Sequence, residues 1–437
     1  MDRGDNCSGG VMQRLLVSSI FLAVFGIFSI ILPSCLHAEN ASAEDIRIGA
    51  VVDLTGPHAT RGQLNLRGME DYFRYINETT SGISGREIVL AVVDGGTGVA
   101  DALKDMEKLC VSEKVHMATV YNAHISERAR PIFVKHKVPH MDASNCPAIL
   151  RPPVSYTYLP FGSAVLDCYA ILQYIQMTHG GSAPPRIGIL TANDTCGKSI
   201  HGPSEAYASN HRLQIVSIEQ FTPGAKDLNP AMLKLKGAGA EYIFMQCAPS
   251  DAVTALKSAD RIHYNVPFFS TWTLMGPDFF NLGKRLIRNR TNISFPGCLP
   301  GDGATGINLI KILIDRYKSV SGFHTAYWEG VSIAAIVARA LQSAHETLGK
   351  IDGQAINLAL ETFEREDFGA LIPDITYTDT NHSASFVTRI VRVNENRTFT
   401  PLTKFWNPKT EKVTIIHGLI QSFSQRRPLA KRRFPIH

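Results

Sequence analysis

The pattern of apolar and polar residues is clearest over residues 46–77. Residues 46–52 form a short, mostly β-branched run with the length of a strand, and the turn formers at 53–57 end it. From Gln63 onward, apolar residues recur every three or four positions, which predicts an amphipathic helix that packs on a sheet. Ligands of open α/β sheets bind beyond the carboxyl ends of the strands, so the loop at 54–62 is a candidate site wall. An ordinary connection between strand and helix is the alternative.

The same alternation continues along the chain. Apolar runs at 87–94, 115–120 and 138–142 predict three further strands. Helical periods separate them, at 99–113 and in a segment for which Ser126 is the expected N-cap. Strands that alternate with helices at this spacing predict a parallel sheet with right-handed crossovers.

A second alternating set follows an extended aromatic stretch at 155–163. Two long helical patterns come later, at 307–320 and 325–348, after a stretch rich in Pro and Gly near 295–301. The further strands are predicted at 186–190, 213–219, 242–245 and 268–271, with a closing antiparallel pair at 385–393 and 399–405.

These segments predict an α/β fold with two doubly wound parallel-sheet lobes, joined by three hinge crossings. We expect the crossings at 155–163, near 295–301 and at 371–377. A hinge of this kind lets two lobes close around a ligand without chemistry. The predicted division is a signal peptide at 1–43, a first lobe at 44–158 and 300–372, a second lobe at 159–299 and 373–415, and a basic tail at 416–437.

The N-terminal residues have the pattern of an export signal. The stretch 15–32 is uncharged and almost wholly apolar, Arg14 precedes it, and the small residues of 41–43 follow. This order is typical of a signal peptide, so we expect cleavage after Ala43 and a protein exported to the periplasm. A lipoprotein attached through Cys35 and an uncleaved membrane anchor are the alternatives.

The charge of the chain is mild. Charged residues make up 19% of the sequence, and the formal net charge is +5. Because this charge is also dispersed, we expect no nucleic-acid partner. The exception is the basic segment 425–437, which is either a contact for an anionic surface or, in our preferred interpretation, a frayed and solvated chain end.

The cysteines permit disulfides. Six of the eight lie outside the predicted leader, and an even number in an exported protein is compatible with pairing. Cys146, Cys196 and Cys247 each follow a predicted strand, so they could face one cleft, and a disulfide or buried thiols is the simplest interpretation. No spacing of Cys or His is typical of zinc, and we expect neither a metal nor a cofactor.

Several segments together resemble a known family, the type I periplasmic solute-binding proteins of the branched-chain amino-acid (Leu/Ile/Val-binding) group of ABC importers. They span nearly all of residues 45–406 in the family's order. The segments are IRIGAVVDLTGPHATRGQLNLRGMEDYFRYIN, GISGREIVLAVVDGG, VPHMDASN, RIGILTANDTCGKS, FTPGAKDLNPAMLKLKGAGAEYIFMQC, VPFFSTW, AYWEGVSIAAIVARAL and ITYTDTNHSASFVTRIVRV.

The resemblance implies an exported substrate-binding component that delivers a small molecule to membrane permease subunits and acts as a monomer. In the family, the first lobe holds the ligand carboxylate with backbone N–H groups and small hydroxyls on two loops. These loops correspond to 121–126 and 142–146 in this chain. A serine expected near Ala123 is absent, and the threonine expected at Cys146 is a cysteine. The remaining hydroxyl candidates are Ser126 and Ser144.

The second lobe departs further from the family. Amino-acid binders place an acidic residue after the strand at 268–271, where it neutralises the ligand ammonium, and Trp272 occupies this position here. A buried ammonium without a partner costs several kcal/mol, and cation–π attraction recovers only about 1–2 kcal/mol. We therefore expect a small carboxylate, an aromatic or dicarboxylic acid, and not an α-amino acid.

The candidate ligand residues come from both lobes. Trp272, Tyr327 and Phe161 would stack on a ring, although hinge packing is the preferred interpretation for Phe161. Arg61 or His124 would bind the carboxylate. For Arg61 the alternative is a solvated residue before a helix, and for Trp272 it is a core or hinge aromatic. The predicted ligand-binding residues are Arg61, Tyr121, Ala123, His124, Ser126, Ser144, Asn145, Cys146, Asp194, Gln246, Ala248, Trp272 and Tyr327.

Other functions stay open at this point. A ligand-sensing receptor of the same fold would control a signalling partner, and a binder of branched-chain amino acids or amides is a further alternative. We do not expect an enzyme, because no Ser/His/Asp, paired-carboxylate or metal-ligand pattern stands out. Glu329, with the nearby His324, is more simply explained by helix polarity.

Overall fold

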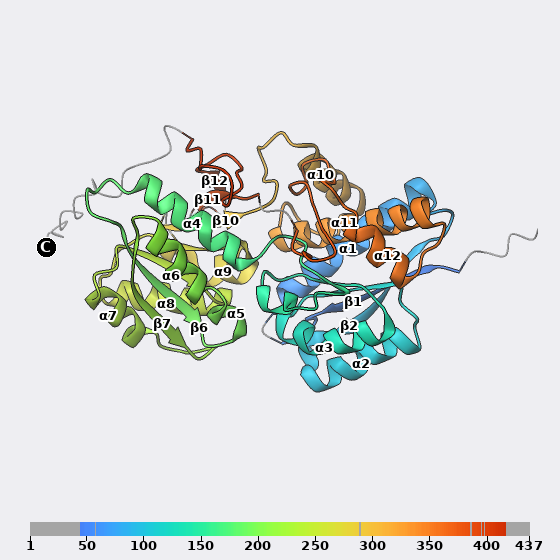
Figure 1. Cartoon of the computed structure of the whole chain (residues 1–437), viewed down its shortest axis with the longest axis horizontal. Coiled ribbons are helices and arrows are strands. Elements are labelled where there is room, and N and C mark those ends of the chain that lie inside the picture. The colour runs from blue at the N-terminus through green and yellow to red at the C-terminus, as the bar shows by residue number, and fades with distance from the viewer. Residues whose placement is uncertain are drawn as a thin grey trace, which may run out of the picture. The chain divides into compact units, whose positions relative to one another are not determined.

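The computed structural model covers most of the chain after the predicted leader (Figure 1). The residues that it describes are 44–56, 58–287, 290–384, 387–394, 396 and 398–416. The predicted signal peptide, the alternative lipid attachment at Cys35 and the basic segment 425–437 lie outside these residues. In the described ranges, no helix is both long enough and apolar enough to cross a bilayer.

The first sheet is wholly parallel, as the alternating pattern predicts. Its strand order is β2-β1-β3-β4-β5. The strands are β1 (Ile46–Val52), β2 (Ile88–Asp94), β3 (Met117–Val120), β4 (His140–Asp142) and β5 (Thr157–Tyr158).

Both faces of the first sheet are covered because β1 is apolar on both sides. Ile48 and Ala50 share a core with α1 and α11, whereas Val51 packs with residues of α2 and α3 on the opposite face (Figure 1). The helices of this lobe are α1 (Ala59–Thr80), α2 (Val99–Val111), α3 (Ala123–His136), α10 (Thr305–Tyr317), α11 (Thr325–Leu348) and α12 (Gly353–Glu361).

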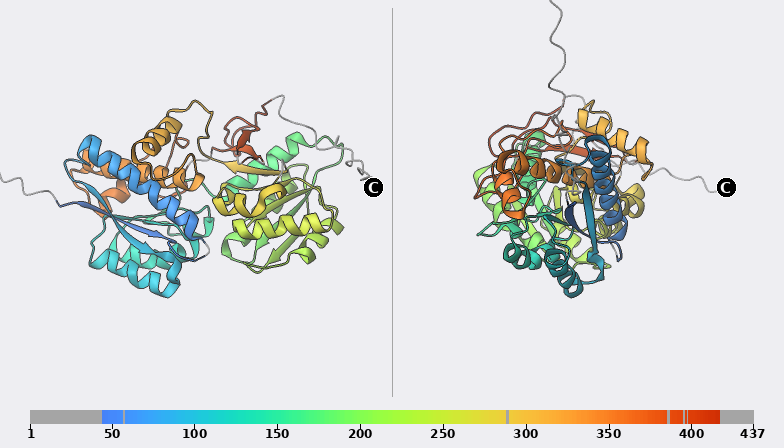
Figure 2. Two further views of the ribbon diagram at one scale, coloured as in Figure 1. Left: turned by 180° about the vertical axis from the view of Figure 1, so that it is seen from behind. Right: turned by 90° about the vertical axis from the view of Figure 1, so that its right-hand side faces the viewer.

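Two glycines bring α1 and α11 into close contact (Figure 1, Figure 2). A Cβ atom on Gly330 would overlap the carbonyl oxygen of Asn65, and one on Gly68 would overlap the carbonyl oxygen of Tyr327. Only residues without side chains allow the two backbones to approach this closely. The contact fixes the start of α1, and with it the loop that follows β1.

The second sheet is parallel over five strands and antiparallel at one edge. Its strand order is β12-β11-β10-β9-β8-β6-β7, with β11 and β12 forming the predicted closing antiparallel pair. The strands are β6 (Arg186–Ala192), β7 (Gln214–Phe221), β8 (Tyr242–Gln246), β9 (Phe268–Thr271), β10 (Thr291–Phe295), β11 (Arg389–Val393) and β12 (Phe399–Pro401).

Helices also cover both faces of this sheet. Tyr242 and Phe244 of β8 pack with residues of α4, whereas the intervening Ile243 packs with residues of α7 and α8. The helices are α4 (Ala164–Thr178), α5 (Thr195–Lys198), α6 (His201–Asn210), α7 (Asn229–Gly237), α8 (Pro249–Arg261) and α9 (Pro277–Gly283). Short 3₁₀ turns are η1 (Gly95–Thr97), η2 (Pro147–Leu150), η3 (Trp272–Leu274) and η4 (Lys284–Leu286).

The chain passes between the two lobes three times: after β5, after β10 and before β11. The third crossing is predicted at 371–377, where Tyr377 lies against the first passage. Tyr377 donates a hydrogen bond from Oη to the carbonyl of Leu159, and the N–H of Ala384 donates to the same carbonyl. Tyr377 also packs edge-on against Tyr158 of β5, with ring centroids 5.1 Å apart. This segment is therefore held against the chain at the end of β5, and the position of the third crossing stays a prediction.

Candidate functional site

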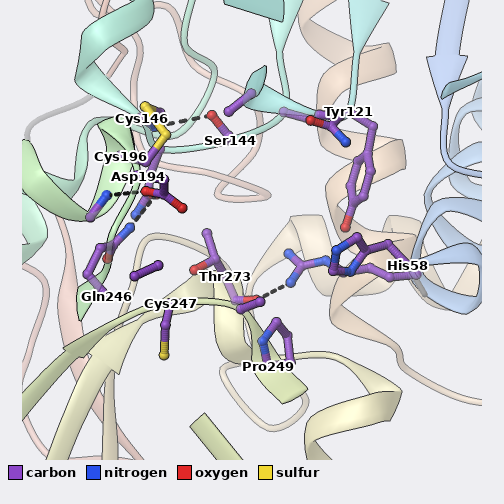
Figure 3. A pocket seen from close by; sticks show the side chains of 18 of the residues that line it. His58, Tyr121, Ser144, Cys146, Asp194, Cys196, Gln246, Cys247, Pro249 and Thr273 are labelled. Carbon is purple, nitrogen blue, oxygen red and sulfur yellow. Dashed lines mark hydrogen bonds between the residues drawn. A yellow bond between two sulfur atoms is a disulfide. The ribbon is translucent and has the colours of Figure 1, made fainter. Parts of the chain in front are cut away.

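A cavity of about 230 Å³ lies where the carboxyl ends of strands from both sheets meet (Figure 3). This is the position at which parallel α/β sheets place their ligands. His58 and Arg61 contribute from the loop and helix start after β1, as the sequence predicts. The other lining residues are Asp53, Tyr121, Asn122, Ala123, Ala143, Ser144, Asn145, Cys146, Ala192, Asp194, Cys196, Gly197, Gln246, Cys247, Ala248, Pro249, Thr273 and Gly276.

The N-terminus of α3 forms part of the first-lobe wall. Asn122 precedes the helix; its backbone carbonyl accepts from the N–H of Ser126 at 2.8 Å, and its Oδ1 accepts from the N–H of Ile125 at 3.4 Å. Asn122 therefore acts as the N-cap in place of the predicted Ser126, and α3 begins at Ala123. The first N–H groups of a helix lack intrahelical acceptors and carry partial positive charge. This wall favours an anionic group.

Ser144 adds a hydroxyl to the same wall. Its backbone N–H donates to Oδ1 of Asp142 at 2.7 Å, and its Oγ accepts from the N–H of Cys146 at 3.1 Å (Figure 3). These two bonds hold the loop after β4 in a tight turn. The bond to Cys146 uses Oγ as an acceptor, so the hydroxyl proton of Ser144 can be donated elsewhere.

Arg61 lines the cavity, but its charge is compensated. Its Nε lies 3.3 Å from Oε2 of Glu329, and a second nitrogen donates to Oε1 of the same carboxylate. The Glu329 side chain is fully buried on α11; burial raises its pKa, and the attraction of Arg61 opposes that shift. The remaining terminal nitrogen of Arg61 donates to the backbone carbonyl of Thr273, in the second lobe. Arg61 thus joins the lobes, and Glu329 has a role beyond helix polarity.

Two carboxyl groups also face the cavity. Asp53 is 4% exposed, and no residue in the described ranges hydrogen bonds to its Oδ1. Burial raises the pKa of Asp53, and the nearby His58 opposes that shift. Asp194 is the N-cap of α5 and accepts from the N–H of Gly197 at 2.7 Å. The cavity can therefore receive a hydrogen-bond donor or a cation as well as an anion.

A chain of side-chain hydrogen bonds leads from the cavity to the hinge. Gln246 donates from Nε2 to Oδ1 of Asn145 at 3.3 Å, and Asn145 donates from Nδ2 to Oδ2 of Asp167 at 3.2 Å. The hydroxyl of Ser294 on β10 donates to the other oxygen of Asp167 at 2.6 Å. Burial raises the pKa of Asp167 to about 7, and the bonds from Ser294 and Asn145 limit that rise.

The three strand-end cysteines all line this cavity. Cys146 and Cys196 form a disulfide with their Cα atoms 5.1 Å apart. Cys247 is a free thiol, and burial raises its pKa well above the ordinary value. In Figure 3 its sulfur points away from the disulfide.

Nine of the thirteen predicted ligand residues line the cavity: Arg61, Tyr121, Ala123, Ser144, Asn145, Cys146, Asp194, Gln246 and Ala248. The side chain of His124 lies outside what the structure describes. Ser126 is buried within α3, with its Oγ 3.3 Å from Nε2 of His140. Tyr327 is fully buried and donates from Oη to Asp71 at 2.7 Å.

Trp272 is not among the residues that line the cavity, although its ring centroid lies 5.8 Å from the guanidinium carbon of Arg61, which does line it. It is 1% exposed and packs edge-on against Phe161, with ring centroids 5.0 Å apart. The chain turns into η3 at this residue, and the next one, Thr273, lines the cavity instead. This geometry does not support the prediction that the Trp272 indole occupies the place beside a ligand ammonium.

Asp53 and His58 are cavity residues outside the predicted set. Asp53 follows the last residue of β1 directly, so the strand-end rule that selected the other loops also applies to it. In the sequence, Asp53 was counted only among the turn formers, whereas His58 lies in the predicted site wall at 54–62. Among the residues that the structure describes, no group of three or more His, Cys, Asp or Glu side chains could hold a metal ion.

Solved structures of the same fold bind different small molecules. A branched-chain amino acid ABC transporter protein from Thermus thermophilus with bound valine is 21% identical, with a TM-score of 0.74 over 84% of this chain and 97% of that one. A solute-binding protein of an ABC transporter from R. palustris, in complex with benzoate, is 12% identical, with a TM-score of 0.69 over 82% of this chain and 95% of that one. At these identities the likeness shows the fold alone.

The sequence comparisons agree with the fold. Leu/Ile/Val-binding protein homolog 7 of Brucella abortus (strain 2308) is 24% identical over 239 residues, which is 52% of this chain and 58% of the relative. The chain thus matches less than two thirds of that relative's length. Residues 45–398 match the family described as periplasmic binding protein, which confirms the resemblance found in the sequence. The chain belongs to the periplasmic binding protein family.

Proposed function

We propose that this chain is the exported solute-binding component of an ABC transporter and that it binds a small carboxylate by closure of its two lobes. After cleavage near Ala43 it would act in the periplasm as a monomer and deliver the solute to permease subunits, without catalysing a reaction. One observation carries the proposal. The cavity lies at the carboxyl ends of the strands of both lobes, and the N-terminus of α3 forms part of its wall.

The wall of the first lobe favours a carboxylate for electrostatic reasons. Several short donors that converge on one carboxylate form charge-assisted hydrogen bonds, which are stronger than neutral ones. The N–H groups at the start of α3 and the hydroxyl of Ser144 are donors of this kind. Arg61 contributes little net charge, because Glu329 compensates it. The valine and benzoate of the two solved proteins both carry a carboxylate.

The chemical class of the carboxylate has two candidates. An aromatic or dicarboxylic acid would use the ring of Tyr121 or the His58 imidazole, which lie together on one side of the cavity (Figure 3). An α-amino acid is the second candidate, and Asp53 and Asp194 favour it, because either carboxylate could pair with an ammonium. Trp272 gives no ground for excluding an amine, since it does not line the cavity.

A ligand screen tests the proposal. The mature chain is heated with benzoate, dicarboxylates, short amides, leucine and valine, and the shift of its melting temperature is measured. A solute at 100 times its Kd stabilises the native state by about 2.7 kcal/mol, which such a screen detects. We expect the largest shift from a carboxylate. A neutral amide that gives the largest shift would refute the proposal.

Two variants then assign the contacts. Ser144→Ala should weaken binding of the best solute by about 10- to 100-fold, because a hydrogen bond to a charged group is worth about 1.5–3 kcal/mol. Ser209→Ala, on the exposed side of α6, is the matched control. Asp194→Asn keeps an N-cap for α5 and removes only the charge. Asp194→Asn should strongly weaken the binding of an α-amino acid, and a benzoate or dicarboxylate should bind at least as tightly as before.

A further inference from the structure

We propose that the Cys146–Cys196 disulfide is a redox-controlled latch between the two lobes. Cys146 follows β4 of the first sheet, and Cys196 lies in α5, directly after β6 of the second sheet. The bond therefore crosses the solute cavity, whose wall both cysteines help to form. The proposal rests on closure of the lobes as part of the proposed function, but it does not depend on which solute binds.

The disulfide limits how far the lobes can separate. The Cα atoms of the two cysteines are 5.1 Å apart, and a disulfide holds such atoms within about 4.4–6.8 Å. Opening of the cleft at this point is thus restricted to a small movement while the bond is intact. Rotation about the bond is still allowed, but it would leave this side of the cavity closed.

Hydrogen bonds also link the two lobes. Arg61 donates to the carbonyl of Thr273, Gln246 donates to Asn145, and the hydroxyl of Thr325 donates to the carbonyl of Met275. Water can replace each of these bonds when the lobes part. Among the described residues, the disulfide is the covalent link that side chains make between the lobes, in addition to the three backbone passages, so its redox state decides whether the cleft opens fully.

The surface beside the disulfide is hollowed. A second hollow, of about 730 Å³, is lined by residues next to both cysteines, including Pro147, Arg151, Thr195 and Lys198. Cys196 is partly exposed, whereas Cys146 is 2% exposed. A reductant should therefore attack Sγ of Cys196. The positive charges of Arg151 and Lys198 would favour the approach of a thiolate.

The exchange needs a dithiol reductant, either a small dithiol or a thiol–disulfide oxidoreductase. Its thiolate attacks Sγ of Cys196, the bond between the two cysteines breaks, and Cys146 leaves as a thiolate that takes up a proton. The second thiol of the reductant then attacks the mixed disulfide and releases Cys196 as a thiol. Two electrons pass to the protein, and the reductant becomes a disulfide. Oxidation by a disulfide of the same class reverses these steps.

The latch predicts a difference that can be measured without a solute. The aerobically purified mature chain, the same protein treated with a phosphine reductant, and the Cys196→Ser variant are compared by hydrogen–deuterium exchange and small-angle X-ray scattering. We expect exchange in the strand-end segments 143–148 and 192–198 to rise at least tenfold when the bond is absent, and the radius of gyration to increase. Cys247→Ser removes a free thiol from the same cavity and should change neither quantity.

Three results would overturn the latch. Mass spectrometry of the oxidised chain could find no peptide that links Cys146 to Cys196. Reduced and oxidised chains could show equal exchange and equal scattering. Loss of the native far-UV circular dichroism on reduction would make the bond a requirement for folding instead of a latch. All of these measurements are made without a solute. A ligand screen that finds no carboxylate therefore does not contradict the latch, and evidence against the latch does not contradict the proposed binding of a carboxylate.

Discussion

Replacement of Glu329 by Gln should destabilise the chain strongly. The Glu329 carboxylate is fully buried and accepts two hydrogen bonds from Arg61, whose side chain is only 9% exposed. Gln has nearly the same shape and keeps an amide oxygen as an acceptor, but it carries no charge. The variant therefore removes the charge with which Glu329 compensates the buried Arg61 guanidinium.

The size of the effect follows from burial. Removal of one partner from a buried ion pair costs about 3–5 kcal/mol, because the remaining charge keeps its desolvation penalty. We expect Glu329→Gln to lower the free energy of unfolding by about 3 kcal/mol, at the low end of this range, because the carbonyl of Thr273 still accepts from Arg61. The double replacement of Arg61 by Met and Glu329 by Leu removes both charges at similar volume. It should recover most of the loss, because a buried pair exchanged for apolar side chains is often neutral or stabilising.

Urea denaturation of the single and double variants measures these free energies of unfolding. Asp101→Asn is the control, because the Asp101–Lys104 pair is formed on the surface by side chains that are 64% and 74% exposed. Its effect should be far smaller than that of Glu329→Gln. A loss below about 1 kcal/mol for Glu329→Gln, or a double variant less stable than either single one, would refute the reasoning.

Two further predictions concern packing and pH. Gly330→Ala should destabilise the chain by about 1–3 kcal/mol or more in urea denaturation, because the added methyl meets the backbone of Asn65 in α1. Gly202→Ala in α6, where the added methyl meets no other atom, should instead stabilise by up to about 1 kcal/mol, and equal effects would contradict this. Asp167 has its pKa raised to about 7 in the folded chain, from 3.8 when unfolded, so the folded state binds the proton more tightly. Stability should thus fall by about 4 kcal/mol as pH rises from about 4 to about 7, and Asp167→Asn should remove this slope; an unchanged slope would refute it.

The fold was predictable from the sequence where strands and helices alternate strongly. Strands buried on both faces, such as β1 and β8, are continuous apolar runs, and α1 has a clear helical period. The third crossing was predicted at 371–377 because these residues have the pattern of an extended hinge strand. Nothing local shows that Tyr377 packs against Tyr158, which lies more than two hundred residues earlier.

The site was predictable as a set of loops but not as a set of side chains. The strand-end rule selected the loops after β3, β4, β6 and β8, and all of them line the cavity. The direction of a side chain just past a strand depends on the local turn, and the 3₁₀ turn at η3 buries Trp272 and brings Thr273 to the cavity. The ion pair between Arg61 and Glu329 could not be predicted either, because the two residues lie 268 positions apart in the sequence.

The burial of Glu329 changes how the solute must be recognised. An arginine in a ligand cavity would ordinarily indicate that it binds a carboxylate directly, but Arg61 is bound to Glu329 and to the second lobe. A solute carboxylate would have to compete with the buried Glu329 carboxylate, which already accepts hydrogen bonds from two nitrogens of Arg61. The hydroxyl of Ser144 accepts from the N–H of Cys146 and can donate its own proton, and the helix start at Ala123 supplies further neutral donors. Recognition of the anion therefore falls to neutral donors, while Arg61 holds the lobes together over it.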